Sequence, residues 1–460
     1  MNRFIISLSL VSLSMSGYAQ VDNDSIRYNQ YGIEVERIPL QAEARNGILV
    51  FESVNEDYKL WLDFRVNVDG AAFWGEHRDY DPIGNGARIR RGRAAIKTYV
   101  TKDWYGELDL NFADGKVELK DAIIRYEGFT NTELQVGNFK ENFSLARNTS
   151  SRYQQFMERP MAAQALAPSR SLGINAKYQK NWLYASGGIF FQQVDEGETA
   201  DYVDDNNKDY GRNQGMSYTG KLIFQPLYNY KDMALHIGTG ISYRTPKTDV
   251  DPAKFGGSRF STRNSTSINR KKYLDTGVIP EVDYDLIYTF ELAGAYKGLR
   301  FETAFIQNDT HIKSTAPETI DKRTKSFKGH YVQASYLLFG GTQHYDYWGG
   351  KFSQVQRGKA WGDVELALRY DHLNLNSKDI YGGASEAYTV GVNYYVNNNV
   401  KLVLDYQYNN NDRYANGKGK LFVGHDVHGE PTKDPTKVTE SKRKGGVDYS
   451  MLAFRVEIVF

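Results

Sequence analysis

The last stretch of the chain, 447–460, alternates between apolar and more polar positions. One set of alternate positions is entirely apolar and consists of Leu452, Phe454, Val456, Ile458 and Phe460. The other set includes the charged residues Arg455 and Glu457. Because successive side chains of a strand point to opposite faces, this stretch predicts a strand with one apolar and one charged face. A soluble sheet buries its apolar face in a core, whereas a membrane barrel exposes that face to lipid and turns the charges inward.

Similar alternation recurs in about sixteen segments, most of them near the ~9–11 residues that a tilted membrane-spanning strand needs. They are 58–68, 88–100, 104–112, 119–126, 133–138, 171–178, 182–191, 217–225, 233–244, 284–296, 299–307, 329–338, 361–371, 387–395, 400–408 and 447–460. The clearest is 361–371, where Val364, Leu366 and Leu368 alternate with Asp363, Glu365 and Arg369. Burying such charges beneath a soluble sheet is costly, whereas a barrel in lipid suits both faces.

The connections between these segments also differ in length in a regular way. Short turns largely alternate with long polar connections; the turns are 101–103, 179–181, 297–298 and 397–399, and the long connections are 139–170, 192–216, 245–283, 308–328 and 409–446. This alternation is typical of short periplasmic turns and long external loops. Two connections depart from it, a short external one at 113–118 and a long periplasmic one at 339–360. The predicted fold is an all-β, transmembrane, up-and-down antiparallel β-barrel of about 16 strands over residues 47–460.

Composition narrows the class of protein further. Only 40% of the residues are hydrophobic and the mean hydropathy is −0.59, which excludes a bundle of apolar membrane helices. Aromatic residues make up 14% of the chain, as the aromatic girdles of a membrane barrel require. The net charge of +1 indicates neither a nucleic acid nor an acidic partner. The sequence contains no cysteine and no cofactor motif, so we expect no disulfide, thiolate site or cofactor.

The N-terminus carries the features of a secretory signal peptide at 1–19. A positive charge at Arg3 precedes an apolar run to Met15 and a small-residue cleavage site ending at Ala19. The run is too short to cross a bilayer as a helix. Residues 20–46 are polar and predict a periplasmic lead-in. Export and a barrel together predict the outer membrane of a Gram-negative bacterium.

Several stretches carry motifs beyond the alternation of the strands. They are 88–93 (Arg-Ile-Arg-Arg-Gly-Arg), 136–140 with 150–152, 155–160 (Gln-Phe-Met-Glu-Arg-Pro), 336–340 (Tyr-Leu-Leu-Phe-Gly) and 360–365 with 368–370. In their order and spacing they resemble the phosphate-selective porin O and P family of outer-membrane proteins, over residues 47–460. The Ala19–Gln20 junction resembles that of Bacteroidetes-type members, and the terminal Phe460 resembles the sorting signal of outer-membrane barrels.

The resemblance implies a sixteen-stranded barrel, usually a homotrimer, with one long loop folded into the pore. In this chain that constriction loop corresponds to 139–170. The implied function is passive diffusion of small hydrophilic solutes across the outer membrane, in contact with membrane lipid and lipopolysaccharide. Members of the family differ in selectivity, so the family name does not settle the solute.

Cations of the inward faces and of 139–170 are the candidate selectivity groups. Arginine suits anions because its planar fork pairs with carboxylate or phosphate oxygens and keeps its charge, and lysine adds a mobile charge. The predicted anion-binding constriction consists of Arg91, Arg93, Lys97, Arg125, Lys140, Arg147, Arg152 and Arg159. Further cations predicted to face the lumen are Lys177, Lys221, Arg300, Arg369, Lys401 and Arg455. Acidic residues alternate with them, so a salt-bridged ladder that keeps the barrel rigid is the alternative role.

The sequence therefore predicts a diffusion porin rather than an enzyme, with an anion or phosphate bias if 139–170 folds inward. The alternatives are an adhesin or structural barrel and a barrel hydrolase, which needs a Ser/His or Asp/His cluster at one rim. The eight histidines are scattered, and only His236 and His330 fall in predicted strands. The acid-rich loop 192–216 and the pair His425 and His428 lack a recognised ligand spacing, so we expect no metal site.

Overall fold

The computed structural model describes residues 27–36, 38–75, 80–191, 215–246, 257–263, 265–268, 271–441 and 444–460. The chain divides into two units, Met1–Leu40 and Gln41–Phe460. In the described part of the first unit, β1 (Arg27–Tyr28) and β2 (Glu34–Val35) form a short antiparallel pair. The predicted signal peptide and most of the acid-rich loop at 192–216 lie outside the described residues.

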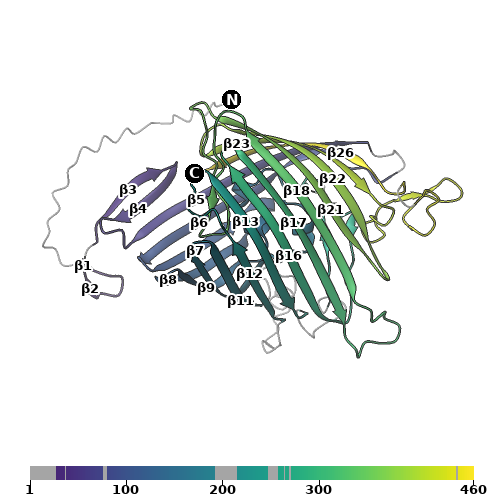
Figure 1. The fold of residues 1–460 in the computed structure, drawn as a ribbon, viewed down its shortest axis with the longest axis horizontal. Helices are drawn as coiled ribbons and strands as arrows, with labels where there is room; N and C mark the ends of the chain where they lie inside the picture. The colour runs from purple at the N-terminus through teal and green to yellow at the C-terminus, as the bar shows by residue number, and fades with distance from the viewer. Residues whose placement is uncertain are drawn as a thin grey trace, which may run out of the picture. The chain divides into compact units, whose positions relative to one another are not determined.

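Sixteen antiparallel strands of the second unit close into a barrel (Figure 1). They are β5 (Lys59–Trp74), β6 (Gly86–Thr101), β7 (Trp104–Asn111), β8 (Glu118–Phe129), β9 (Thr132–Lys140), β10 (Arg170–Lys180), β11 (Leu183–Phe190), β12 (Ser217–Phe224), β13 (Met233–Arg244), β16 (Val282–Tyr296), β17 (Leu299–Ile312), β18 (Lys325–Leu337), β21 (Asp363–Ser377), β22 (Ile380–Tyr395), β23 (Val400–Asn411) and β26 (Tyr449–Val459). Each pairs with the next barrel strand along the chain, and β26 closes the barrel by pairing with β5, with Val456 opposite Val68. The predicted up-and-down barrel is therefore confirmed.

A hairpin precedes the first barrel strand. It consists of β3 (Leu40–Arg45) and β4 (Ile48–Ser53), and β4 pairs with the start of β5. Asn46 and Gly47 join the two strands with φ angles of 54° and 76°, which suits a two-residue hairpin turn. Strand structure thus begins inside the predicted lead-in 20–46, because the Asn-Gly turn sets up a hairpin that the weak alternation around it does not reveal.

The barrel strands are charged inside and apolar outside. On β21, Asp363, Glu365 and Asp371 are fully buried, whereas Leu366 and Leu368 are 46% and 61% exposed. The other strands follow the same alternation, the reverse of a soluble sheet. Lipid accepts the apolar exterior, while buried charges need polar partners within the lumen. Aromatic pairs such as Trp104 with Tyr126 lie near strand ends, as interfacial girdles require.

The two ends of the barrel differ in their connections, as predicted. At one end, here the turn end, two-residue turns occupy 102–103, 130–131, 181–182 and 297–298. At the other, the loop end, the long connections are 141–169, 191–216, 245–281, 313–324 and 412–448. The two predicted departures are present, since the loop-end connection 112–117 is short and the turn-end connection 338–362 is long.

A further departure was not predicted. β21 and β22 continue beyond the expected 361–371 and 387–395 and meet at the loop end in a two-residue turn, 378–379. Past residue 371 the apolar positions switch faces: Leu373 and Leu375 point inward and are buried, and they alternate with the polar His372 and Asn374 on the outer face, so this part does not show the apolar outer face of the other strands. The longer β21 places His372 in a strand, and the longer β17 does the same for His311. The sequence predicted strand positions for His236 and His330 only.

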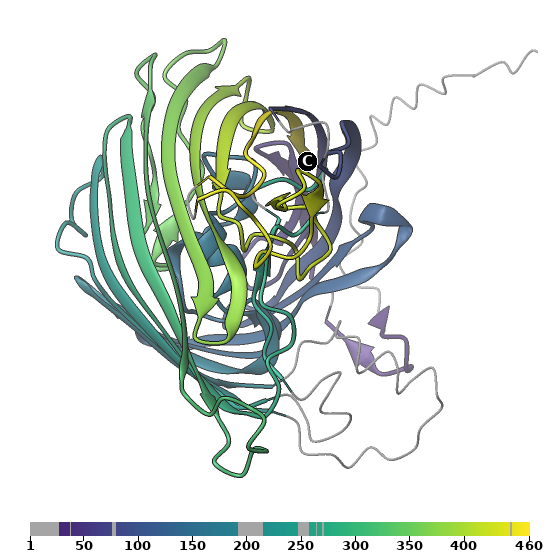
Figure 2. The same cartoon turned by 90° about the vertical axis from the view of Figure 1, so that its right-hand side faces the viewer.

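Three of the loop-end connections fold into the barrel or across that end (Figure 2). Segment 141–169 holds α1 (Leu145–Asn148) and α2 (Met161–Ala165), and segment 245–281 holds β14 (Ser261–Thr262) and β15 (Leu274–Asp275). Segment 412–448 holds β24 (Gly424–His425) and β25 (Pro431–Thr432), and its Gly417 donates to the Tyr273 carbonyl at 3.0 Å. Among the described residues, no helix is long and apolar enough to cross a membrane.

The apolar core lies inside the barrel, where these segments meet one wall. Met161 and Leu166 of the loop 141–169 share a buried cluster with Phe260 and Leu274 of the segment 245–281 and with Leu373 of β21. α2 contacts β14, β17, β18 and β21. The lumen is therefore filled beside the β16–β26 wall, which leaves the polar space on the side of β5 to β11.

Candidate functional site

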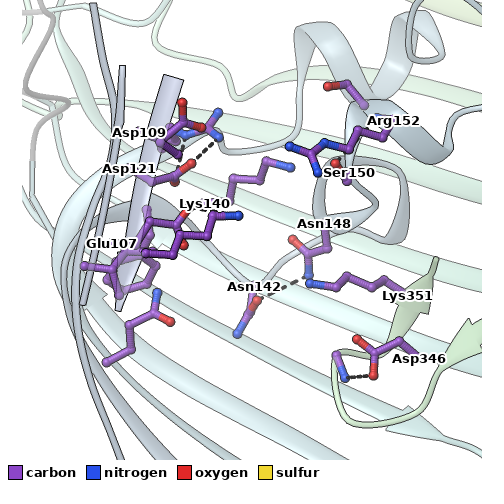
Figure 3. Close-up of a pocket in the computed structure, with 18 of the residues that line it drawn as sticks. Glu107, Asp109, Asp121, Lys140, Asn142, Asn148, Ser150, Arg152, Asp346 and Lys351 are labelled. Carbon is purple, nitrogen blue, oxygen red and sulfur yellow. Dashed lines mark hydrogen bonds and ion pairs between the residues drawn. The ribbon is translucent and has the colours of Figure 1, made fainter. Parts of the chain in front are cut away.

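A polar cavity of about 460 Å³ lies in the lumen between β5–β11 and two inward segments, 141–169 and 338–362 (Figure 3). Its basic lining residues are Arg65, Arg91, Arg93, Lys97, Arg125, Lys140, Arg152, Arg159, Arg170, Lys177 and Lys351. Its acidic lining residues are Asp63, Glu107, Asp109, Asp121, Glu133 and Asp346. Eleven cations against six carboxylates leave the lining with a surplus of positive charge, which favours anions.

Seven of the eight predicted constriction residues line this cavity, and Arg147 does not. Arg147 donates instead to the carbonyls of Ala163 and Gln164, at 2.8 and 2.7 Å. The last carbonyls of a helix have no partner within the helix, so this guanidinium caps the C-terminal part of α2. The cavity also contains Arg170, which belongs to the predicted inward loop 139–170, and two cations that were not predicted for the constriction, Arg65 and Lys351.

Most carboxylates of the cavity are matched by a neighbouring cation. Arg170 pairs with Asp121 through two hydrogen bonds of 2.9 and 2.7 Å. Lys97 donates to Asp63 at 2.8 Å, and Asp63 also accepts from Arg152. Lys177 binds Glu133 in the same way. These pairs are the salt-bridged ladder considered from the sequence, and they neutralise the acids of the wall.

Among the described residues, five cations of the cavity have no close carboxylate partner, and one of them, Arg159, donates to the Ala146 carbonyl of the loop at 2.6 Å. In the described part of the chain, the side chains of Lys140 and Lys351 make neither a hydrogen bond nor an ion pair, and Figure 3 shows them on opposite sides of the open space. Arg65 donates to the Ser151 hydroxyl at 2.5 Å, and Arg91 comes no closer to a carboxylate than 3.9 Å, at Glu158. An ammonium group without a partner offers its hydrogen-bond donors to an anionic solute.

Only part of the arginine-rich stretch 88–93 faces open space. Arg90 pairs with Glu158 of the loop at 2.5 Å, and Arg88 binds Asp114 and the Ser267 carbonyl. Burial opposes ionisation of the Glu158 carboxyl, but Arg90 and Arg91 outweigh it and hold the pKa of Glu158 below its ordinary value. Glu158 therefore fastens the loop to β6 and removes part of the positive charge expected there.

The cations of the opposite wall hold the loop 141–169 in place. The donors and their acceptor carbonyls are Arg300 to Tyr153 at 3.0 Å, Arg369 to Glu158 at 2.9 Å, Lys401 to Arg152 at 2.9 Å and Arg455 to Met157 at 2.7 Å. Wall carboxylates accept from loop amides, with Asp371 at 2.6 Å from Met161 and Asp405 at 2.8 Å from Met157. A buried loop needs such partners for its backbone, so these residues position the loop.

The turn-end segment 338–362 contributes Trp348 and Lys351 to the cavity, which sequence reasoning did not foresee. It holds β19 (Tyr345–Asp346) and β20 (Lys351–Phe352). The Trp348 indole donates to Glu133 at 3.2 Å, and the Lys177 ammonium lies 4.2 Å from the Trp348 ring centroid. The signal in the sequence was the length of this connection at an end of the barrel where short turns are usual.

Comparison with known proteins identifies the family. The model of the family described as phosphate-selective porin O and P matches residues 61–428. Porin O of Pseudomonas aeruginosa is 24% identical over 408 residues, which cover 81% of this chain and 88% of that protein. An uncharacterized protein of Caulobacter vibrioides is 28% identical over 336 residues, and the match spans 70% of this chain but only 63% of that relative.

Solved structures share the fold at low sequence identity. The anion-selective porin from Comamonas acidovorans has a TM-score of 0.50 and 9% identity, with 88% of this chain and 100% of that chain covered. OmpF of Salmonella typhi in complex with daunomycin has a TM-score of 0.50 and 11% identity, with 89% and 100% covered. These likenesses support the fold alone, whereas the family match over residues 61–428 shows that the chain belongs to the phosphate-selective porin O and P family and is an outer-membrane porin.

Proposed function

We propose that this porin conducts small hydrophilic solutes by passive diffusion and favours anions, phosphate among them, at the cationic cavity. The observation that carries the proposal is the pair of unpartnered ammonium groups, Lys140 and Lys351, in a lining where cations outnumber acids. The channel acts by sorting solutes, so no residue is assigned a catalytic role. The family assignment favours this reading over an adhesin or a barrel hydrolase.

An anion entering the cavity loses part of its hydration shell, and the lining must replace it. Arg91 and Arg65 offer planar donors that match two oxygens of a phosphate or carboxylate, while Lys140 and Lys351 offer movable charges from two sides. The acid-paired cations, such as Arg170, keep the wall rigid without adding net charge. Binding spread over several sites lets an anion leave as readily as it enters.

The comparisons support the anion preference and suggest an assembly. One structural relative is described as anion-selective and another, OmpT of Vibrio cholerae with a TM-score of 0.50, as a trimer form. We infer a homotrimer for this chain, with the turn end facing the periplasm, the loop end outside, and lipid and lipopolysaccharide around the barrel. The features at 1–19 support removal of a signal peptide before assembly.

Ion selectivity in planar bilayers tests the proposal. Under a potassium chloride gradient, the reversal potential of the wild type should correspond to chloride permeating several-fold better than potassium. The double variant Lys140→Gln with Lys351→Gln should lower that ratio at least two-fold, and phosphate should inhibit the chloride current about ten-fold less strongly. Lys102→Gln, in an exposed turn, serves as the control and should behave as wild type. A cation-selective wild type, or an unchanged double variant, would contradict the proposal.

A further inference from the structure

A row of polar side chains interrupts the apolar exterior of the barrel. On β18, β21 and β22, His330 lies directly opposite His372, and His372 lies directly opposite Glu386. Directly paired residues of adjacent strands share one face of the sheet. Their neighbours Tyr331 and Asp371 are fully buried in the lumen, so this row points outward.

The two imidazole rings lie at a separation suited to one shared metal ion. Their centroids are 5.0 Å apart and their planes differ by 32°. Zinc binds histidine nitrogen at about 2.1 Å, so two imidazoles at a tetrahedral angle have ring centroids roughly 5.2 Å apart. The observed centroid separation is therefore close to that of two imidazoles on one ion.

The donors around this pair also fit a metal ion. The Nδ1 atom of His372 is buried and has no hydrogen-bond partner among the described residues. Glu386 is the acidic group and Lys328 the basic group within electrostatic range of His372. Two imidazoles with one carboxylate form a donor set typical of zinc, with a further position open to water.

The row lies where dissolved ions have access. His372 is nine residues along β21 from Asp363, about the ~9–11 residues that a tilted strand needs to cross the apolar layer. One step nearer the turn end, the rings of Tyr370 and Tyr388 pair at 5.3 Å, as in an interfacial girdle. The histidine row thus lies at the headgroup boundary, beyond the tyrosines.

We propose that His330, His372 and Glu386 form a surface site for Zn²⁺ or a similar borderline divalent cation on the exterior of the barrel. The site is separate from the lumen and does not depend on the solute that the pore conducts. A bound ion crosslinks three neighbouring strands at the loop end, where β21 and β22 extend beyond the apolar layer. Binding therefore stabilises the native barrel.

Zinc binding to the purified, detergent-solubilised protein without a histidine tag tests this site. Equilibrium dialysis at neutral pH should find one Zn²⁺ per chain in the wild type, with at least ten-fold weaker binding in His372→Ala and in His330→Ala. Glu386→Gln should weaken binding several-fold. Lys328→Gln should strengthen it several-fold, because a repelling charge is removed. His311→Ala is the matched control, since His311 also lies in a barrel strand but stacks on Tyr284 at 4.2 Å.

A second readout separates metal binding from misfolding. Zinc should raise the temperature at which the wild type loses its compact mobility in gel electrophoresis, and it should not shift His372→Ala, whose mobility without metal should match wild type. Magnesium at the same concentration should have no effect, because a hard ion prefers oxygen ligands. No zinc bound at about 100 µM, or equal affinity in wild type and His372→Ala, would overturn the proposal.

Discussion

At the scale of single residues, cationic side chains have two different roles inside this barrel. Lys140 and Lys351 face open space, whereas Lys401 and Arg455 donate to carbonyls of the loop 141–169. The difference lies in what stands opposite each side chain. Side chains of a wall that faces a packed loop must form hydrogen bonds with the backbone of that loop. Side chains of a wall that faces water are free to bind a solute.

Arg455 provides a test of the structural role. It is buried, with two hydrogen bonds of 2.7 Å to Asp69, so Arg455→Met leaves that carboxylate buried without its partner. We expect a loss of about 3–5 kcal/mol in the free energy of unfolding, measured by urea titration in detergent or bilayers. Adding Asp69→Asn should recover most of the loss, and a double variant no more stable than the single one would contradict this account.

At the scale of elements, the loop 141–169 and the segment 338–362 are tied to one buried carboxylate. Glu291 accepts from the Leu145 amide at 2.6 Å and pairs with Lys221 at 2.8 Å. Glu291 also contacts His236 at 3.3 Å, whose other ring nitrogen lies 2.6 Å from the Tyr345 hydroxyl. Both segments that bound the cavity are thus positioned from the same point on β16.

Removing this anchor should loosen both segments. Glu291→Ala leaves the Leu145 amide and Lys221 without their acceptor, so we expect larger single-channel conductance, noisier open-channel current and a lower chloride preference. Glu318→Ala is the control, since the Glu318 side chain is 95% exposed. Current traces identical to wild type would show that the anchor is dispensable.

A deletion within the segment 338–362 tests whether this segment narrows the pore. Thr342 and Gln356 exchange two backbone hydrogen bonds of 2.8 and 2.9 Å, so a Gly-Gly turn in place of 343–355 can join them. The variant loses Trp348 and Lys351 and should conduct more current with weaker anion preference. Unchanged conductance in bilayers would mean that this segment does not narrow the path.

At the scale of the whole molecule, stability depends on an exterior that only lipid or detergent tolerates. Leu368 is 61% exposed, whereas the adjacent Arg369 is 5% exposed and faces the lumen. In contrast to a soluble protein, the barrel therefore has apolar residues on its outer surface and charged residues inside. Folding in plain buffer should expose the apolar face and lead to aggregation.

A charge on the exterior tests this arrangement. Leu368→Arg should cost about 2–4 kcal/mol of folding free energy near the bilayer midplane, because lipid cannot solvate the guanidinium. The measurement is urea unfolding in phospholipid bilayers, with Leu368→Ala as the control for lost side-chain volume. Equal stability of the two variants would contradict a lipid-facing position for Leu368.

The sequence by itself determined the barrel and its two-sided strands, whereas the inward loop was expected only from the resemblance to a family. Alternation is a local property, so Leu366, Leu368 and Arg369 reveal their faces without knowledge of the rest of the fold. The same holds for most of the cavity cations, since seven of eight predicted residues lie on inward faces or on the loop 141–169 and line the cavity.

Only the tertiary structure decided which charges remain free to meet a solute. The role of a lumen cation depends on the segment that packs opposite it, and neither the docking of the loop on β16–β26 nor the inward course of 338–362 is encoded in the spacing of side chains. Arg147 was therefore placed wrongly, Lys351 was missed, and the pairing of His330 with His372 became visible only through strand register. Alternation shows which face a side chain occupies, but distant parts of the chain decide what it meets there.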